Sequence, residues 1–306
     1  MKYPILSSFI TIFGILLVTG CNTTQPLHIA ALDGDLAMVR DLSSKGNSIN
    51  QKYTVDPTYQ GFTPLHMAIN NGHKDVALYL IKHGAYVNTA GNKGRTPLHL
   101  ASYNGMPQVA KAIIAKGGNV NASTNDGATP LHSAAIGIKN NTHLLKILLT
   151  KGANINAGKD SVIGTPLLYS ARYGDVDIAN ILVNNGADIS ATDESGNTTL
   201  HIASQFGRFE LVNYLLMRNP DVNALNKANN TPLHLAVMSG RRMVAEQLVY
   251  HGANLTGKNS TGDTPLKCAE KYDKDTIIAL LEPITESETK GSETETEKDE
   301  PSILAD

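Results

Sequence analysis

A four-residue string, Thr-Pro-Leu-His or a close copy of it, returns along this chain of 306 residues at an almost constant interval. The best copies begin at Thr63, Thr96, Thr129, Thr165, Thr198, Thr231 and Thr264, and a degenerate copy begins at Gln25. Neighbouring members of the first group lie 33 residues apart, except for one step of 36 residues. So regular a period indicates one small structural unit stacked many times. Such an array presents a long surface, which suits binding better than catalysis.

Each repeated unit carries the signals of two short helices. Thr63 is suited to cap the start of a helix, and Pro64 fits the first helical position, where no amide hydrogen is needed. Gly72 and Gly84 stand where two successive helices would end, because the chain there needs a left-handed residue. The apolar spacing between these glycines predicts a second helix with one face to bury. A helix pair of this size has too little core to fold alone, so neighbouring units must cover its apolar faces.

The repeated residues closely resemble the ankyrin repeat, whose period and tetrad they share. The resemblance covers residues 25–282 and implies an all-α solenoid of about eight helix-turn-helix repeats. It also implies a protein that binds another protein and needs no cofactor. The predicted repeats span residues 25–58, 61–93, 94–126, 127–162, 163–195, 196–228, 229–261 and 262–282.

Some copies depart from the repeat pattern. Leu168 replaces the tetrad histidine in the fifth repeat, and Thr199 replaces the tetrad proline in the sixth. Residues 50–60 predict an enlarged loop between the first two repeats. In the eighth copy, Lys267 and Glu270 replace apolar or small residues, as a terminal repeat with a solvated outer face requires. The stack is therefore expected to end at this copy.

Six of the ten histidines occupy the last position of the tetrad. In the ankyrin family this imidazole ties the tetrad to neighbouring backbone, so the resemblance implies structural roles for His28, His66, His99, His132, His201 and His234. Adjacent stacked helices lie about 8–10 Å apart, which is too far for successive imidazoles to share one zinc ion at about 2 Å. We therefore predict no metal site.

The repeats show no catalytic motif. No Gly-rich phosphate loop joins a strand to a helix, and no nucleophile stands in the strained turn that hydrolases use. The carboxylates, such as Asp175, Asp177 and Glu210, follow no paired pattern suited to acid–base catalysis. The sequence therefore predicts a protein that is not an enzyme.

The start of the chain predicts an exported protein. Lys2 precedes an apolar run over residues 5–18, which is too short for an ordinary transmembrane helix and is typical of a signal peptide. The run closes with Thr19-Gly20-Cys21, which resembles a bacterial lipobox, where the cysteine becomes the acylated first residue of the mature protein. Two or more acyl chains give stable membrane anchoring. The alternative is a plain secretory signal with a coincidental cysteine.

On this basis we predict a signal peptide over residues 1–20, lipidation at Cys21 and a short linker over residues 21–24. By resemblance to enterobacterial sorting, Asn22 after the cysteine favours the outer membrane over the inner membrane. The predicted location is the bacterial cell envelope, on the periplasmic face, with the membrane contacted through the lipid anchor.

Residues 283–306 differ in composition from the repeats. Eight acidic residues against two lysines give this segment a charge of −6, so the chain's total of −2 leaves about +4 for everything before it. Because Ser, Thr and Gly fill most of its other positions, we predict an acidic disordered tail. The tail could shield a basic patch or simply solvate the end of the stack. Nucleic acid is not expected as a partner, since the rest of the chain has only a slight positive excess.

The candidate protein-binding residues lie in the loops and at the ends of the first helices, where partners usually meet ankyrin-type stacks. Aromatic residues and Arg are favoured at binding hot spots. The predicted contact residues are Tyr59, Phe62, Arg95, Tyr103, Arg172, Tyr173, Phe206 and Met238. The alternative is that each ring packs against the next repeat and covers core.

The sequence thus predicts a lipid-anchored, non-enzymatic scaffold that holds a protein partner, for example an immunity protein that blocks a periplasmic toxin. An ankyrin effector that acts on host proteins and an envelope assembly scaffold are the alternatives. A membrane-tethered Cys21 disfavours the effector, because a tethered protein cannot be injected into a host cell.

Overall fold

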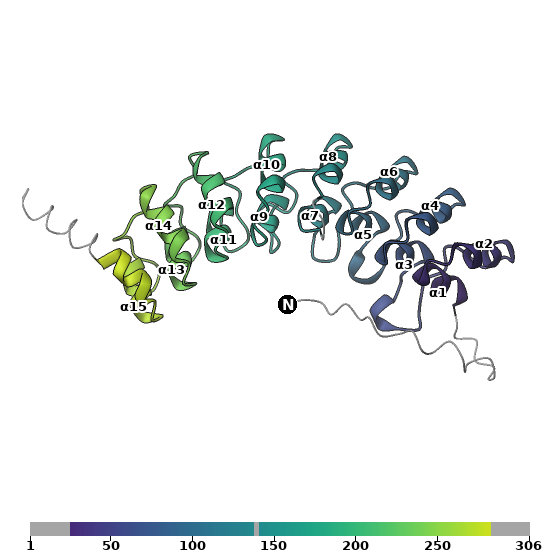
Figure 1. Cartoon of the computed structure of the whole chain (residues 1–306), viewed down its shortest axis with the longest axis horizontal. Helices are drawn as coiled ribbons and strands as arrows, with labels where there is room; N and C mark the ends of the chain where they lie inside the picture. Colours follow the sequence, from purple (N-terminus) through teal and green to yellow (C-terminus); the bar gives the residue numbers. More distant parts are fainter. Residues whose placement is uncertain (1–24, 138–140, 283–306) are drawn as a thin grey trace, which may run out of the picture.

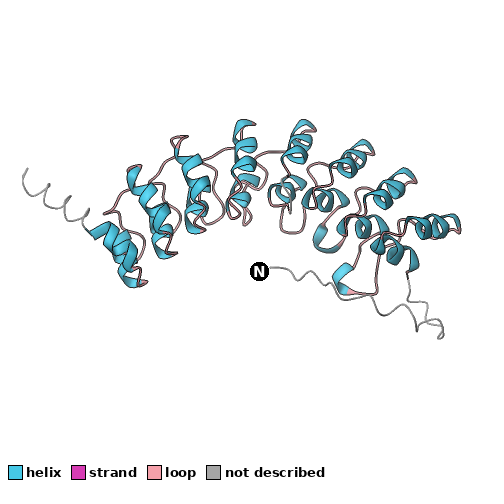
Figure 2. Ribbon diagram, in the orientation of Figure 1, coloured by secondary structure: helices cyan, strands magenta, loops and turns pink. Residues whose placement is uncertain are grey.

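A computed structural model describes residues 25–137 and 141–282 of the chain. Within these ranges all regular elements are helices, and they stack in one curved row from α1 to α15 (Figure 1). One helix of each repeat lies on the inner, concave side of the arch and the other on the outer, convex side (Figure 2). The predicted all-α stack of helix-turn-helix units is confirmed.

The helices alternate between the inner and the outer side. The inner helices are α1 (Pro26–Asp33), α3 (Pro64–Asn70), α5 (Pro97–Tyr103), α7 (Pro130–Ala135), α9 (Pro166–Ala171), α11 (Thr199–Gln205), α13 (Pro232–Met238) and α15 (Pro265–Lys271). The outer helices are α2 (Leu36–Ser44), α4 (Lys74–Lys82), α6 (Pro107–Ala115), α8 (Thr142–Thr150), α10 (Val176–Asn184), α12 (Phe209–Leu216) and α14 (Arg242–Tyr250). The short 3-10 turns η1 (Pro57–Tyr59) and η2 (Asn92–Gly94) lie in loops.

The tetrad sets the start of each inner helix from α3 onward. Thr231 has an extended conformation and its side chain accepts a hydrogen bond from the amide of His234, while Pro232 takes the first helical position. At the other ends, α3 stops before Gly72 and α4 before Gly84, whose φ angles of +80° and +92° lie in the left-handed region. The predicted helix starts and ends are therefore confirmed, and they follow from local backbone chemistry.

The hydrophobic core runs through the whole stack. One cluster of buried side chains extends from Leu27 in the first repeat to Leu281 in the last. From the second repeat to the seventh, the tetrad leucines are at most 1% exposed, as shown by Leu65, Leu98, Leu131 and Leu167. Burial of one such side chain contributes about 2 kcal/mol. Because each repeat covers the apolar face of its neighbour, loss of one repeat would expose core on both sides.

Asparagine side chains join consecutive repeats along the outer loops. Asn88 Nδ2 donates to the carbonyl oxygen of Gly117 at 2.9 Å, and Asn88 Oδ1 accepts from the amide of Asn119 at 2.8 Å. Equivalent pairs of bonds are made by Asn50, Asn121 and Asn223. One amide group thus serves both a donor and an acceptor of the next repeat, which fixes the spacing of adjacent outer loops.

Two predicted segments lie outside the described residues. These are the signal peptide with Cys21 and its linker, over residues 1–24, and the acidic tail over residues 283–306. Over the part of the chain that is described, no helix is long and apolar enough to span a membrane. The lipid anchor and the tail therefore stay predictions.

Candidate protein-binding surface

The tetrad histidines connect each repeat to backbone beyond its own helix pair. The amide of Thr129 donates to Nδ1 of His132 at 3.1 Å, so Nε2 carries the proton. Nε2 then donates to the carbonyl oxygen of Gly164, 3.0 Å away in the next repeat. Equivalent bonds to the following repeat are made by His66, His99, His201 and His234. With both ring nitrogens bonded to backbone, these imidazoles have none left for a metal ion.

Burial lowers the pKa of these imidazoles. The pKa of His66 and that of His132 fall to about 4, chiefly because the buried site disfavours the charged ring. The hydrogen bond to the neighbouring carbonyl oxygen opposes this effect but is weaker. Burial also lowers the pKa values of His28, His99, His201 and His234. All these rings are therefore neutral at pH 7 and act as fixed hydrogen-bonding groups.

One interface is built without this imidazole. Leu168 takes the tetrad position in the fifth repeat and is 1% exposed. The fifth and sixth repeats are joined by other polar contacts, including the Tyr214 hydroxyl, which donates to Asn180 Oδ1 at 3.2 Å. Arg208 Nε also donates to the carbonyl oxygen of Arg172 at 2.8 Å. This junction thus replaces a buried imidazole bond with apolar packing and more exposed hydrogen bonds.

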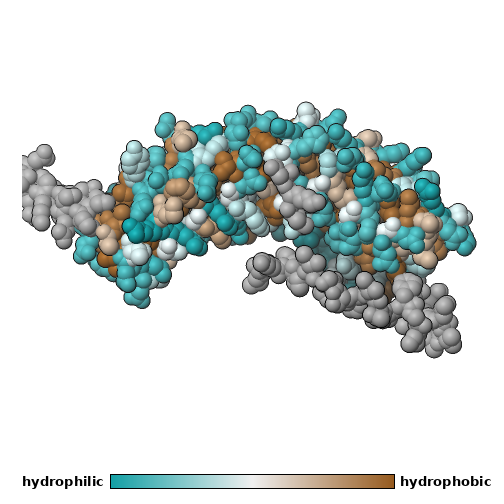
Figure 3. Space-filling view, in the orientation of Figure 1, coloured by the Kyte–Doolittle hydropathy of each residue, from teal (hydrophilic) through white to brown (hydrophobic). Residues whose placement is uncertain are grey.

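Most of the predicted contact residues are exposed. The exposed ones are Arg95, Tyr103, Arg172, Tyr173 and Phe206. Among the aromatic side chains Tyr103, Tyr173 and Phe206, that of Tyr173 is the most exposed, at 56%. Tyr59 and Met238 are half-buried and pack against the core. In the space-filling view, apolar surface forms separate patches among hydrophilic residues rather than one continuous sheet (Figure 3).

The prediction of a contact role for Phe62 was wrong. This side chain is 4% exposed, and its ring stacks on that of His66 with the centroids 5.0 Å apart. The enlarged loop turns back on itself, because the amide of Tyr53 bonds to the carbonyl of Phe62 and the amide of Gly61 to the carbonyl of Tyr53. Tyr59 then covers Phe62 at a centroid distance of 5.8 Å. Phe62 therefore closes the core beside the tetrad and cannot meet a partner.

The exposed rings occupy two neighbouring positions at the ends of the inner helices. Tyr173 and Phe206 each stand immediately before the glycine that follows the helix, whereas Tyr103 stands one residue earlier, as does the half-buried Met238. Tyr272, which the sequence analysis did not select, is 42% exposed and precedes Asp273, which replaces the glycine in the last repeat and has a φ angle of +53°. The rings thus form an edge of the stack rather than a single row in register.

A row of basic side chains beside these rings was also missed. Arg208 Nε donates to the carbonyl oxygen of Arg172 at 2.8 Å, and Arg241 Nε donates to that of Gln205 at 3.2 Å. Each arginine precedes an outer helix and reaches back to the end of the inner helix in the preceding repeat. Lys274 holds the same position one repeat later. The signal in the sequence is the 33-residue spacing of these three residues.

In the first half of the stack, asparagines make the corresponding contacts. Asn71 Nδ2 donates to the carbonyl oxygen of Leu32 at 3.2 Å, and Asn104 Nδ2 donates to that of Ile69 at 3.0 Å. Both asparagines stand immediately before the glycine, the position that Tyr173 holds in the fifth repeat. In the sixth repeat Arg208 makes this contact instead, and the position before the glycine carries the exposed ring of Phe206.

Aromatic rings and basic side chains are in contact near the ends of the inner helices of the fifth and sixth repeats. The guanidinium carbon of Arg172 lies 5.8 Å from the ring centroid of Phe206, a cation–π contact that stabilises by about 0.5–1 kcal/mol at an exposed site. We call this surface the aromatic-basic edge and define it by Arg172, Tyr173, Phe206, Arg208, Arg241 and Lys274.

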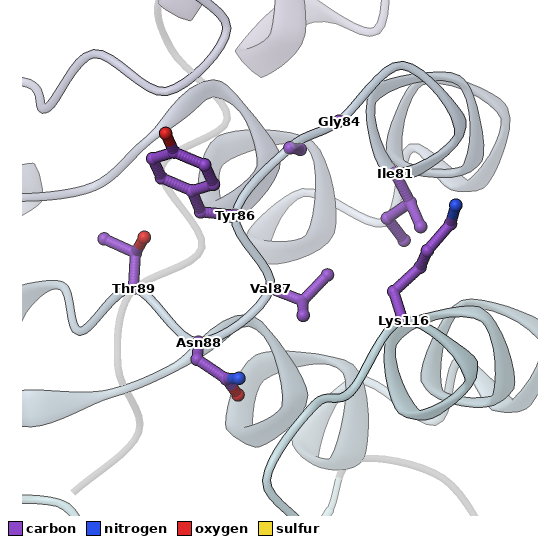
Figure 4. Close-up of a pocket in the computed structure, with 8 residues that line it drawn as sticks. Ile81, Gly84, Tyr86, Val87, Asn88, Thr89 and Lys116 are labelled. Carbon is purple, nitrogen blue, oxygen red and sulfur yellow. The ribbon is translucent and has the colours of Figure 1, made fainter.

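A depression of about 530 Å³ on the outer side offers no catalytic arrangement. It lies between the loop after α4 and the end of α6, where Ile81 and Val87 line it and Lys116 is its one charged residue (Figure 4). The side chain of Asn88 is already bonded to the next repeat. Within residues 25–137 and 141–282, no group of three or more His, Cys, Asp or Glu could hold a metal ion.

Comparison with known proteins identifies the architecture. A family model described as "Ankyrin repeats (3 copies)" matches residues 9–91, 87–159, 139–226 and 200–290, which together make up most of the chain. The chain belongs to the ankyrin repeat family. Ankyrin repeats are typical of protein-binding scaffolds. Among solved structures, the human ASB11 ankyrin repeat domain matches with a TM-score of 0.63 and 29% identity, over 68% of this chain and 91% of that one.

Curated relatives match over shorter stretches of the chain. Mouse protein phosphatase 1 regulatory subunit 27 is 43% identical over 68 residues, which are 22% of this chain and 41% of that protein. L-asparaginase of Dirofilaria immitis is 32% identical over 181 residues, which are 58% of this chain and 23% of that protein. The chain spans less than half the length of either relative. Ankyrin repeat proteins are typically non-enzymatic, and the match to the asparaginase is partial and distant.

Proposed function

We propose that this ankyrin repeat protein is a lipid-anchored, non-enzymatic scaffold of the bacterial envelope that holds a protein partner at the exposed ends of its inner helices. The observation that carries the binding role is the exposure of Tyr173 and Phe206 in successive repeats, with Arg172 over the Phe206 ring. Exposed aromatic rings and Arg are the residues that dominate binding energy in protein interfaces. Because the repeats hold these rings in place beforehand, little conformational entropy is lost on binding.

The proposed location rests on the start of the sequence. The apolar run before Cys21 and the small residues that precede this cysteine support a lipid anchor, and Asn22 supports the outer membrane. The periplasmic face would present the stack to proteins that enter that compartment. A stoichiometric binder there is suited to neutralise a toxin, so the specific role we propose is that of an immunity protein.

Capture of partners from envelope extract tests the binding surface. The variant Tyr103→Ala/Tyr173→Ala/Phe206→Ala removes rings from the ends of the inner helices. A matched control, Tyr86→Ala/Met217→Ala/Tyr250→Ala, removes side chains that are 66%, 78% and 83% exposed along the outer loops and helices. We expect a protein retained by wild type and by the control to be reduced at least about tenfold on the first variant. Unchanged capture with a lowered thermal midpoint would instead show that the three rings are core.

Metabolic labelling tests the anchor. Cells that express the wild-type chain and a Cys21→Ser variant are grown with a palmitate analogue, and membrane and soluble fractions are compared. We expect label and membrane retention with wild type and loss of both with the variant, because the acylated thiol is gone. A labelled, membrane-bound Cys21→Ser protein would contradict the anchor and leave the binding surface unaffected.

Toxin sensitivity tests the specific role. A strain that lacks this chain should become sensitive to the toxin made by its neighbours, and expression of the wild-type chain should restore resistance. Full resistance in the deletion strain would argue against the immunity role.

A further inference from the structure

We infer that residues 283–306 dock on the aromatic-basic edge as an intramolecular occupant. The inference concerns this chain's own acidic segment, and because the edge includes Tyr173 and Phe206, a partner bound at these rings would compete with it. It rests on the geometry of the edge, on complementary charge and on the point where the segment is attached.

Arg208 and Arg241 of the edge are held in place by backbone. A Cβ atom on Gly174 would lie 2.7 Å from Cδ of Arg208, and one on Gly207 would lie 2.7 Å from Cδ of Arg241, so each stem lies directly against a glycine. The Nε atom of each arginine is bonded to a carbonyl oxygen of the preceding repeat. These bonds use one of the five N–H donors of each guanidinium, and the others are available to a carboxylate.

The edge continues into the last repeat. Lys274 lies beside Gly240, with 3.5 Å between its Cδ and the position of a Cβ on that glycine. At about 10 Å per repeat, the three cations from Arg208 to Lys274 span about 20 Å. Arg242, next to Arg241, is paired with Glu246 at 2.9 Å and does not join the row. Carboxylates also lie near the row, at the starts of the outer helices, including Asp175, Glu210 and Asp275.

The acidic segment matches this row in charge and in reach. It carries −6 and follows residue 282, in the same repeat as Lys274. Its 24 residues can extend to about 80 Å, several times the length of the row. A tether of this kind gives an effective concentration of the order of millimolar, far above that of a second copy in dilute solution. Residues 283–306 of the same chain are therefore the occupant that we assign.

Zero-length cross-linking with a carbodiimide tests this assignment on the full chain. The variants Arg208→Lys and Arg241→Lys keep the positive charge and provide amines that can be joined to tail carboxylates, as Lys274 already does. The exposed Lys227 and Lys258 serve as controls. They lie in the loops that follow α12 and α14, in the same repeats as Arg208 and Arg241. We expect cross-links from residues 283–306 to positions 208, 241 and 274 to exceed those to the controls about fivefold, and to fall to the control level in 1 M salt.

Equal cross-linking to the edge and to Lys227 and Lys258 would overturn the assignment. Cross-links that join labelled to unlabelled chains, when the two are mixed, would also overturn it, because the occupant would then be a second copy. A second measurement uses a poly-glutamate peptide as probe. Replacing the tail carboxylates by amides should raise its affinity for the full chain about tenfold, and an unchanged affinity would contradict docking. Both measurements use the chain with Tyr103, Tyr173 and Phe206 intact and without a partner, so their failure is distinguished from loss of partner capture by the triple alanine variant.

Discussion

The Nε2 atom of His132 lies 3.0 Å from the carbonyl oxygen of Gly164, so a neutral imidazole in one ankyrin repeat holds the backbone of the next. Protonation would place a second N–H on Nδ1, where the amide of Thr129 already donates. The buried ring cannot accept that proton without losing the amide bond. This contact, repeated along the stack, makes its stability depend on pH.

Acid should unfold the protein well before its carboxylates are protonated. The pKa values of the tetrad imidazoles are lowered on folding, so between about pH 6.5 and pH 4 the unfolded chain binds more protons and stability falls as the pH falls. For His66 and His132, whose pKa drops from 6.5 to about 4, the loss is on the order of 3 kcal/mol each. Urea unfolding followed by circular dichroism between pH 7.5 and 5 should already show about 2 kcal/mol of this loss for each of the two histidines. Equal stability at the two ends of this range would contradict the prediction.

The substitution His132→Leu should separate the imidazole bond from general acid effects. Leu168 shows that this chain accepts leucine at the tetrad position. At pH 7 we expect the variant to be about 1–3 kcal/mol less stable, because the carbonyl of Gly164 loses its donor. As the pH falls to 5, the free energies of unfolding of variant and wild type should converge. Parallel curves would show that His132 is not responsible for the acid sensitivity.

The junction between the fifth and sixth repeats should open before its neighbours. Leu168 replaces the imidazole there, and the hydrogen bonds that join these repeats are nearer the surface. Native-state hydrogen exchange at neutral pH should show the amides of α9 and α11 exchanging about tenfold faster than those of α5 and α7. Uniform protection along the inner helices would mean that apolar packing at Leu168 fully replaces the imidazole bond.

Two glycines with the same backbone conformation should tolerate alanine differently. Gly72 and Gly174 both have φ near +80°, but a Cβ on Gly72 would meet open space, whereas one on Gly174 would lie 2.7 Å from Cδ of Arg208. Gly72→Ala should cost about 1 kcal/mol from backbone strain alone, and Gly174→Ala about 2–3 kcal/mol. Urea unfolding compares the two directly. Equal costs would show that Arg208 moves aside freely and that the edge is not rigid.

The asparagines of the outer loops should contribute measurably to stacking. Asn88→Ala removes both the bond to the carbonyl of Gly117 and the bond from the amide of Asn119, and should cost about 1–2 kcal/mol. Asn88→Asp keeps the acceptor and loses the donor, so its cost should be about half as large. Lys111→Ala, at an exposed position on α6, is the control. A cost for Asn88→Ala no greater than for this control would show that the side chain is a passive surface group.

Local signals predicted the fold well. Thr63 and Gly72 fix a helix start and a helix end through their own backbone chemistry. The positions of the helices, and hence the stacked architecture, could therefore be predicted from the sequence. Phe62 was misplaced because its burial depends on how the enlarged loop folds back on Tyr53, which no local pattern encodes. The contacts of Arg208 and Arg241 were missed for a similar reason, since each side chain reaches across to the preceding repeat.

Circular dichroism of isolated fragments tests most directly the claim that one repeat does not fold without its neighbours. One fragment holds the third repeat alone, residues 94–126, and another holds four repeats, residues 94–228. Because the lone helix pair leaves the faces around Leu98 uncovered, we predict an unfolded spectrum for the short fragment. The long fragment should give a helical spectrum and a cooperative thermal transition. A single repeat that is helical and melts cooperatively would contradict the account.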